Sequence, residues 1–149
     1  MSLHSFPLLR PPGGLDPGLI RWQAFPAGEG SVQAARRVLH TQLEAWRLPG
    51  EVCADAVLLL SELTTNAVLH AGGGDILCGF GLVADARLRL EVHDHGPAAA
   101  DLSPRLPGPW EESGRGLFLV HHLAHAWGAD RSPLTGGNAV WATLALRGR

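Results

Sequence analysis

Apolar residues recur at helical spacing along two adjacent stretches of the chain. The first stretch predicts a helix over residues 31–48, with Ser31 in the N-cap position and a Pro-Gly pair to end it. The second predicts a longer helix over residues 51–71, with an acidic residue in its first turn and three glycines after its last. Two consecutive helices therefore occupy the first half of the chain.

Four other stretches have the composition of β-strands. They are residues 19–25, 75–83, 87–93 and 139–146. The middle two are joined by a short polar turn and predict an antiparallel hairpin. In the second of them, leucine and valine alternate with Arg87, Arg89 and Glu91, which is typical of a sheet with one face in water.

The rest of the chain completes the predicted fold. Residues 1–18 are rich in Pro and Gly and predict a flexible tail, so the folded domain is expected to span residues 19–149. Residues 94–113 show no periodicity, and a connection of that length indicates a functional role. A further helix is predicted over residues 114–127, closed by Gly128. The order is strand, helix, helix, hairpin, loop, helix and two strands, and of the two final strands only the last, residues 139–146, has defined bounds. It predicts an α+β fold with helices on one face of a mixed, mostly antiparallel sheet.

The composition narrows the range of functions. The chain has 149 residues, 46% of them hydrophobic and 17% charged, which suits one domain with a single core. Its net charge is -2 and its cations are scattered, so direct binding to nucleic acid is not expected. All 12 cationic residues are arginines. The absence of lysine excludes a P-loop lysine, a lysine of the eukaryotic protein-kinase type and a Schiff-base lysine.

The two cysteines and the N-terminus bear on the location of the protein. Cys53 and Cys78 each lie in an apolar run, which favours two buried free thiols over a disulfide. Residues 1–20 lack the basic start and unbroken apolar core of a signal peptide. No uninterrupted apolar run reaches the roughly eighteen residues needed to span a bilayer. We therefore expect a soluble cytoplasmic protein that does not act at a membrane.

A polar stripe interrupts the otherwise apolar second helix. Glu62 and Asn66 lie one turn apart, and Asp55 falls on the same stripe. Such a stripe is usually the solvated side of an amphipathic helix. If this one is buried, the carboxylate and the amide need partners, which indicates a binding or catalytic site.

Two further motifs have a structural and a functional interpretation. Asp94, at the end of a predicted strand and followed by His95 and Gly96, is either an ordinary turn former or an acceptor for a ligand amino group. Gly114 and Gly116 lie at the start of a predicted helix, where backbone N–H groups either begin the helix or hold an anion.

These three pieces, in this order, resemble the N box, G1 box and G2 box of the GHKL ATPases. The matching segments are residues 62–70, 94–97 and 114–120, and the resemblance extends over residues 19–146. The short chain, the form of the N box and the ending Gly-Gly-Asn-Ala-Val-Trp-Ala are most similar to the histidine-kinase-like ATPase domains of bacterial anti-sigma factors. The resemblance implies a two-layer α/β sandwich of the Bergerat type.

The resemblance also implies a role for each matching residue. Asn66 would ligate Mg2+, and Glu62 would be the general base for the attacking water or hydroxyl group. Asp94 would accept a hydrogen bond from the adenine amino group of ATP, and Gly96 would leave room for the ring. The phosphates would be held by the helix start, formed by Gly114, Arg115 and Gly116, and residues 98–113 would form a lid.

Some residues depart from the family pattern. Ala98 stands where the G1 box has a second glycine, and Asn138 stands where many relatives have a threonine. Leu69 lies near the place where histidine kinases have a lysine in the N box, and we assign Arg115 as a replacement positive charge toward the triphosphate. His121 and His125, one turn apart, could grip a metal, although cations near a helix end are favoured without one.

The resemblance implies an ATP-binding regulatory protein of the anti-sigma type. Such a protein transfers the γ-phosphate of ATP to a serine or threonine of an anti-anti-sigma partner, binds a sigma factor and forms a homodimer. An alternative is an interaction switch in which ATP sets a protein interface without phosphotransfer. A third hypothesis is an α+β domain that binds no nucleotide, with the three boxes present by coincidence.

Overall fold

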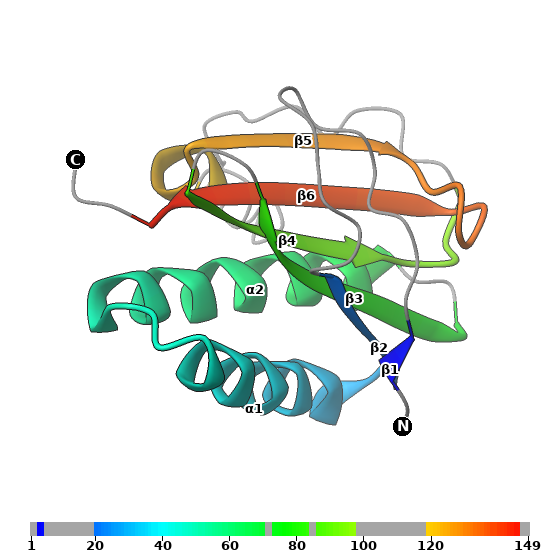
Figure 1. The fold of residues 1–149 in the computed structure, drawn as a ribbon. Helices are drawn as coiled ribbons and strands as arrows, with labels where there is room; N and C mark the ends of the chain where they lie inside the picture. Colours follow the sequence, from blue (N-terminus) through cyan, green and yellow to red (C-terminus); the bar gives the residue numbers. More distant parts are fainter. Residues whose placement is uncertain (1–2, 5–19, 71–72, 84–85, 98–118, 147–149) are drawn as a thin grey trace.

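Two helices lie side by side on one face of a six-stranded sheet (Figure 1). The computed structural model describes residues 3–4, 20–70, 73–83, 86–97 and 119–146. The helices are α1 (Glu29–Ala45) and α2 (Gly50–His70). The strands are β1 (Leu3–His4), β2 (Ile20–Pro26), β3 (Asp75–Val83), β4 (Arg87–His93), β5 (Ala126–Arg131) and β6 (Asn138–Ala145). The predicted fold class, an α+β two-layer sandwich, is confirmed.

The strands follow the order β1-β2-β3-β4-β6-β5, and every pairing among the described strands is antiparallel. The predicted hairpin is present with its predicted bounds as β3 and β4, in a register that pairs Leu82 with Leu88. The two-residue strand β1, inside the stretch predicted to be a tail, pairs Leu3 with Gln23 of β2. No element was expected there from the sequence.

Helix α1 begins two residues before the predicted N-cap. Gly28 is the cap residue, and Ser31 lies inside the first turn, where its hydroxyl donates to the Gly28 carbonyl at 2.6 Å. The same hydroxyl accepts a hydrogen bond from the Gly28 N–H at 3.3 Å. Ser31 therefore stabilises the start of the helix from within it, and the predicted N-cap position was wrong by three residues.

Helix α2 is the central element of the core. It packs against α1 and across β4 and β6, and Leu59, Leu60 and Leu63 are fully or almost fully buried. By length and composition alone, α2 is apolar enough to cross a membrane. Many of its apolar residues belong to the core between α1 and the sheet, whereas Leu58 and Leu69 are exposed.

The helix predicted over residues 114–127 ends earlier than predicted, and its predicted start lies outside the described residues. The described part is helical over residues 119–123, and β5 begins at Ala126. Residues 126–131 pair with β6 instead of continuing the helix. Gly128, taken in the sequence as a helix stop, lies in the strand against the ring of Trp141, where an added Cβ would be 2.8 Å from the ring atoms.

The sheet face predicted to be in water is buried at β4. Arg89, Glu91 and His93 project from the face opposite the helices, yet each has no exposed surface. The guanidinium of Arg89 lies 4.3 Å from the ring centroid of Trp141, and the rings of His93 and Trp22 make an edge contact at 5.3 Å. Burial lowers the pKa of Arg89, and the carboxylate of Glu91 opposes that change. The Arg89 Nε–H and the His93 ring each bond to Glu91 instead of to water.

Both cysteines are free, as predicted. Cys78 is fully buried on β3, and burial raises the pKa of its thiol well above the usual range. Cys53 is partly buried on α2, with its thiol 3.6 Å from the Leu48 carbonyl oxygen. Both therefore behave as small apolar core residues.

Replacing Gly79 by alanine is expected to destabilise the fold by about 1–3 kcal/mol. An added Cβ at this position would lie 2.7 Å from the ring of the fully buried Trp22, so the ring or the strand would have to shift. Urea unfolding measures the loss. Gly30→Ala is the matched control, because nothing lies within 4 Å of its added Cβ. Equal unfolding midpoints for the two variants would contradict the prediction.

Candidate functional site

The C-terminal half of α2 brings together the first two predicted site residues. Glu62 and Asn66 are one helical turn apart, and Asn66 is only 6% exposed. Its side-chain oxygen, Oδ1, is buried and has no hydrogen-bond partner in the described part of the chain. A buried amide oxygen left without a partner costs about 1–3 kcal/mol, so this atom is suited to a ligand.

Glu62 lies beside Asn66 in a partly buried position. Desolvation by this burial raises the pKa of its carboxyl group above the ordinary value. No hydrogen bond or ion pair holds its carboxylate within the described residues. A carboxylate that takes up a proton more readily than usual is suited to act as a general base.

Asp94 follows the last residue of β4 and is held in one orientation. Its Oδ1 accepts three hydrogen bonds: from the Gly96 N–H at 2.8 Å, the Asn138 N–H at 3.3 Å and the Asn138 side-chain amide at 3.2 Å. Its other oxygen, Oδ2, makes no hydrogen bond with the described residues. Asp94 is 4% exposed, and its carboxylate keeps one oxygen that can accept a hydrogen bond from a ligand.

Asn138, a departure from the family pattern, is the principal partner of Asp94. Its side-chain amide also donates to the Pro97 carbonyl at 2.8 Å, and its backbone carbonyl accepts from the Asp94 N–H at 2.9 Å. Asn138 thus connects the start of β6 to both sides of the Asp94 turn. No local sequence pattern predicts this contact.

The turn between β5 and β6 supports Asp94 from its backbone side. Thr135, which the sequence analysis did not single out, donates from its hydroxyl to the Asp94 carbonyl at 2.5 Å. Gly137 lies so close to this carbonyl that an added Cβ would be 2.2 Å from its oxygen. Only glycine fits there, and the glycine pair before Asn138 is the one feature of the sequence from which this close contact could have been inferred.

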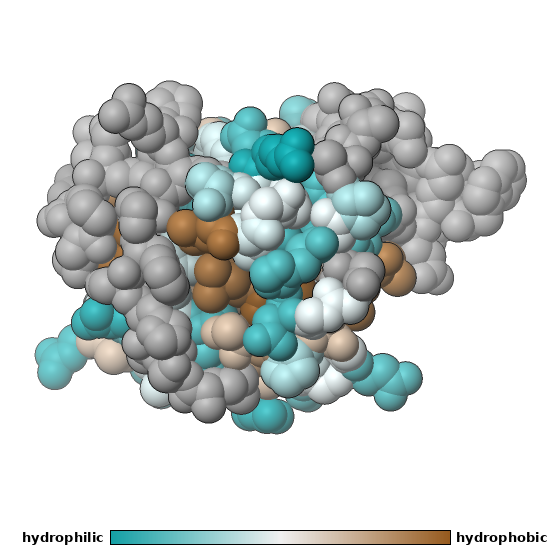
Figure 2. Space-filling view, turned by 90° about the vertical axis from the view of Figure 1, so that its right-hand side faces the viewer, coloured by the Kyte–Doolittle hydropathy of each residue, from teal (hydrophilic) through white to brown (hydrophobic). Residues whose placement is uncertain are grey.

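These groups gather at one side of the molecule. The end of α2, the end of β4 and the start of β6 lie together at the right of Figure 1, and α2 packs on both strands. Figure 2 shows this side, where hydrophobic and hydrophilic described residues both reach the surface. A ligand bound here would meet apolar and polar groups together.

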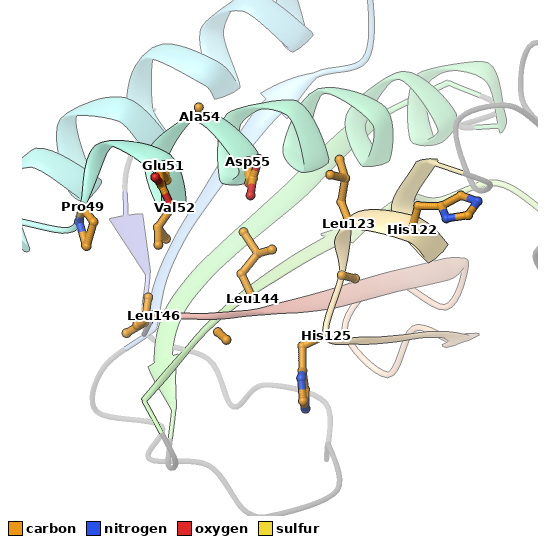
Figure 3. A pocket seen from close by; sticks show the side chains of 12 residues that line it. Pro49, Glu51, Val52, Ala54, Asp55, His122, Leu123, His125, Leu144 and Leu146 are labelled. Carbon is orange, nitrogen blue, oxygen red and sulfur yellow. The ribbon is translucent and has the colours of Figure 1, made fainter. Parts of the chain in front are cut away.

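Asp55 belongs to a different part of the molecule from Glu62. It lines a cavity of about 1000 Å3 between the first turns of α2, residues 122–125 and the end of β6, where Asp55 and Leu123 point into the space (Figure 3). None of Glu62, Asn66, Asp94 or Gly96 lines this cavity. The polar stripe seen in the sequence is therefore divided between two sites.

Other predicted residues lie outside the described part of the chain. These are Ala98, Gly114, Arg115 and Gly116, together with the lid predicted over residues 98–113. Both histidines of the predicted pair are described, but only His121 is helical, because the helix ends at residue 123. His121 accepts from the Trp127 indole at 3.4 Å, and the His125 N–H donates to the Thr143 carbonyl at 2.7 Å. Within residues 3–4, 20–70, 73–83, 86–97 and 119–146, no group of three His, Cys, Asp or Glu side chains could hold a metal ion.

The chain matches the model of a known protein family. The model of a family described as the histidine kinase-like ATPase domain matches residues 25–144, which is most of the chain. The matched range begins in β2 and ends in β6, and it includes Glu62, Asn66, Asp94 and Asn138. No curated protein matches the chain.

Proposed function

The chain belongs to the histidine kinase-like ATPase domain family, and on that premise we propose that it is an ATP-binding regulatory protein of the anti-sigma type. It transfers the γ-phosphate of ATP to a serine or threonine of an anti-anti-sigma partner. Its location is cytoplasmic, it acts as a homodimer and it also binds a sigma factor. These finer assignments rest on the resemblance of the three boxes.

The arrangement around Asp94 is the observation that supports ATP binding most strongly. One carboxylate oxygen is saturated by Gly96 and Asn138, and the other is left as an acceptor. Adenine presents an amino group at its 6-position, whereas guanine presents a carbonyl oxygen there, which a carboxylate repels. The fixed acceptor of Asp94 therefore selects adenine over guanine.

Asn66 is suited to hold Mg2+. Its buried Oδ1 without a partner is a neutral hard oxygen, the kind of ligand that Mg2+ takes in combination with phosphate oxygens and water. The bound ion would neutralise charge on the triphosphate. In this proposal Gly114, Gly116 and Arg115 hold the phosphates.

Glu62 is the general base in the proposed transfer. The hydroxyl oxygen of the partner's serine or threonine forms a bond to the γ-phosphorus as the bond from that phosphorus to the bridging oxygen of ADP breaks. The hydroxyl proton passes to the Glu62 carboxylate, and ADP leaves with the electron pair of the broken bond. The raised pKa of Glu62 supports this role, because it brings the base closer to the neutral working range.

Calorimetric titration with ATP and with GTP, in the presence of Mg2+, tests the binding step. We expect ATP to bind and GTP to bind much more weakly. Asn66→Ala is expected to weaken ATP binding about tenfold in Mg2+ and to change it little in EDTA, because only the metal contact is lost.

The matched control is Thr65→Ala, which alters an exposed neighbour on the same helix. It should bind ATP as the unaltered protein does. Absence of ATP binding by the folded protein would overturn the proposed function. An equal loss in Mg2+ and in EDTA would contradict the metal role of Asn66.

A further inference from the structure

A chain of buried side chains runs along β4 toward the candidate nucleotide site. The Nε–H of Arg89 donates to Glu91 Oε2 at 2.6 Å, and Glu91 Oε1 lies 2.8 Å from His93 Nε2. The other ring nitrogen, Nδ1, lies 2.6 Å from the hydroxyl oxygen of Ser132. Arg89, Glu91 and His93 have no exposed surface, and Ser132 is 2% exposed. None of these four hydrogen-bonded side chains has a role in the proposed function.

The other hydrogen bonds of Ser132 determine which atom carries the proton in its contact with His93. Its hydroxyl oxygen accepts from the N–H groups of Leu134 at 3.1 Å and Thr135 at 3.0 Å. A hydroxyl has two acceptor sites and one proton, so its O–H must donate to His93 Nδ1. The ring proton of His93 is then on Nε2, where it donates to Glu91.

The same hydroxyl holds the turn that supports Asp94. Besides the two side-chain bonds, the Ser132 N–H donates to the Gly137 carbonyl at 2.8 Å, and its carbonyl accepts from the Gly136 N–H at 2.9 Å. Thr135, placed by Ser132, donates to the Asp94 carbonyl and accepts from the Gly137 N–H at 3.1 Å. Asp94 is thus held by its backbone through this turn, while Asn138 and Gly96 hold its side chain.

We propose that Ser132 and His93 are positioning residues for Asp94, and that the buried chain from Arg89 to Ser132 sets the discrimination between adenine and guanine nucleotides. The inference rests on the proposed function, because it assigns a role toward the same carboxylate. His93 takes part by accepting the Ser132 proton, which leaves both lone pairs of the hydroxyl for the turn. An Nδ1–H tautomer would compete for those lone pairs and loosen the turn.

The first test needs no nucleotide. Long-range 1H–15N NMR of the 15N-histidine-labelled protein reports which ring nitrogen carries the proton, and His93→Gln identifies the His93 signals by their absence. We expect Nε2 to be protonated and Nδ1 to show the shift of an acceptor nitrogen. A proton on Nδ1 would overturn the inference even if ATP binds as proposed.

The second test compares nucleotide selectivity. Ser132→Ala is expected to weaken ATP binding about tenfold and to leave GTP binding unchanged. The dissociation constant for GTP divided by that for ATP should therefore fall about tenfold. Ser132→Thr, which keeps the hydroxyl, should restore the ratio. The matched control is Thr143→Val, which removes a buried hydroxyl from β6 whose bond, to the Ala126 carbonyl at 3.5 Å, is not linked to Asp94.

The outcomes separate the two proposals. If the unaltered protein binds neither nucleotide, the proposed function fails. If it binds ATP selectively, and Ser132→Ala lowers only the melting temperature, as Thr143→Val does, the positioning role fails while the proposed function stands. If Ser132→Ala lowers the preference for ATP over GTP and Thr143→Val does not, both the proposed function and the positioning role are supported.

Discussion

Replacing Glu62 by glutamine is expected to reduce the rate of phosphotransfer by about 10²–10⁴-fold while ATP affinity stays within about twofold. Glutamine has the size of glutamate but cannot accept the hydroxyl proton. The ligand contacts assigned to Asn66 and Asp94 do not involve this side chain, so binding should survive. Transfer of labelled phosphate from ATP to the partner protein measures the rate, and calorimetry measures the affinity.

The dependence of this rate on pH gives a second readout for Glu62. A general base works only when ionised, so the rate should fall as the pH drops through the pKa of the Glu62 carboxyl. Desolvation raises that pKa, which places the fall at a higher pH than for an exposed glutamate. The weak residual transfer by Glu62→Gln should lack this acid limb.

The Glu62 variant also separates the two functional hypotheses. A protein kinase loses phosphotransfer and keeps ATP binding. An interaction switch would show no phosphotransfer in the unaltered protein, and its ATP-dependent exchange of partners would continue in Glu62→Gln. Unchanged phosphotransfer by the variant would remove Glu62 from the catalytic role and direct attention to another base.

The hydrophobic patterns of the sequence correctly predicted the hairpin strands β3 and β4 and the long helix α2. The bounds of β3 and β4 follow from alternation along each strand and from the turn between them, and the structure has the bounds that the sequence predicts. The long α2 is similarly evident from its apolar run and the glycines after it.

The errors arise where distant residues decide the structure. Residues 126 and 127 continue a helical pattern, but pairing with β6 and the contact of Gly128 with Trp141 make them a strand. The alternation of β4 shows correctly that Arg89 and Glu91 share a face, but it cannot show whether water or other side chains cover that face. Burial is possible because the two charges pair with each other and with His93.

In the candidate site too, contacts within one helix could be predicted and contacts between distant segments could not. Glu62 and Asn66 are neighbours by helix geometry, so their proximity could be predicted from spacing alone. The contact of Asn138 with Asp94 joins β6 to the end of β4, and no local pattern reports it. A departure from a family pattern therefore proved to mark a residue in direct contact with the site.

Replacing Asp94 by asparagine is expected to weaken ATP binding about 100-fold and to reduce the preference for ATP over GTP by at least as much. The three N–H donors from Gly96 and Asn138 require an oxygen at the Oδ1 position. The new amide must then point its NH2 group toward the ligand, where it meets the donor amino group of adenine. The same NH2 group can donate to the 6-carbonyl of guanine, so GTP binding should not fall.

Calorimetric titration of Asp94→Asn with both nucleotides measures this change, and Asp75→Asn is the matched control. Asp75 is an exposed carboxylate at the start of β3, so its replacement removes the same charge without altering a contact to Asp94. An equal loss of ATP and GTP affinity in Asp94→Asn would contradict the predicted acceptor role. It would indicate that the site is distorted, and not that a hydrogen-bond acceptor has been replaced by a donor. If both variants bind ATP normally, Asp94 does not face the adenine, and the choice between adenine and guanine must be made by other residues.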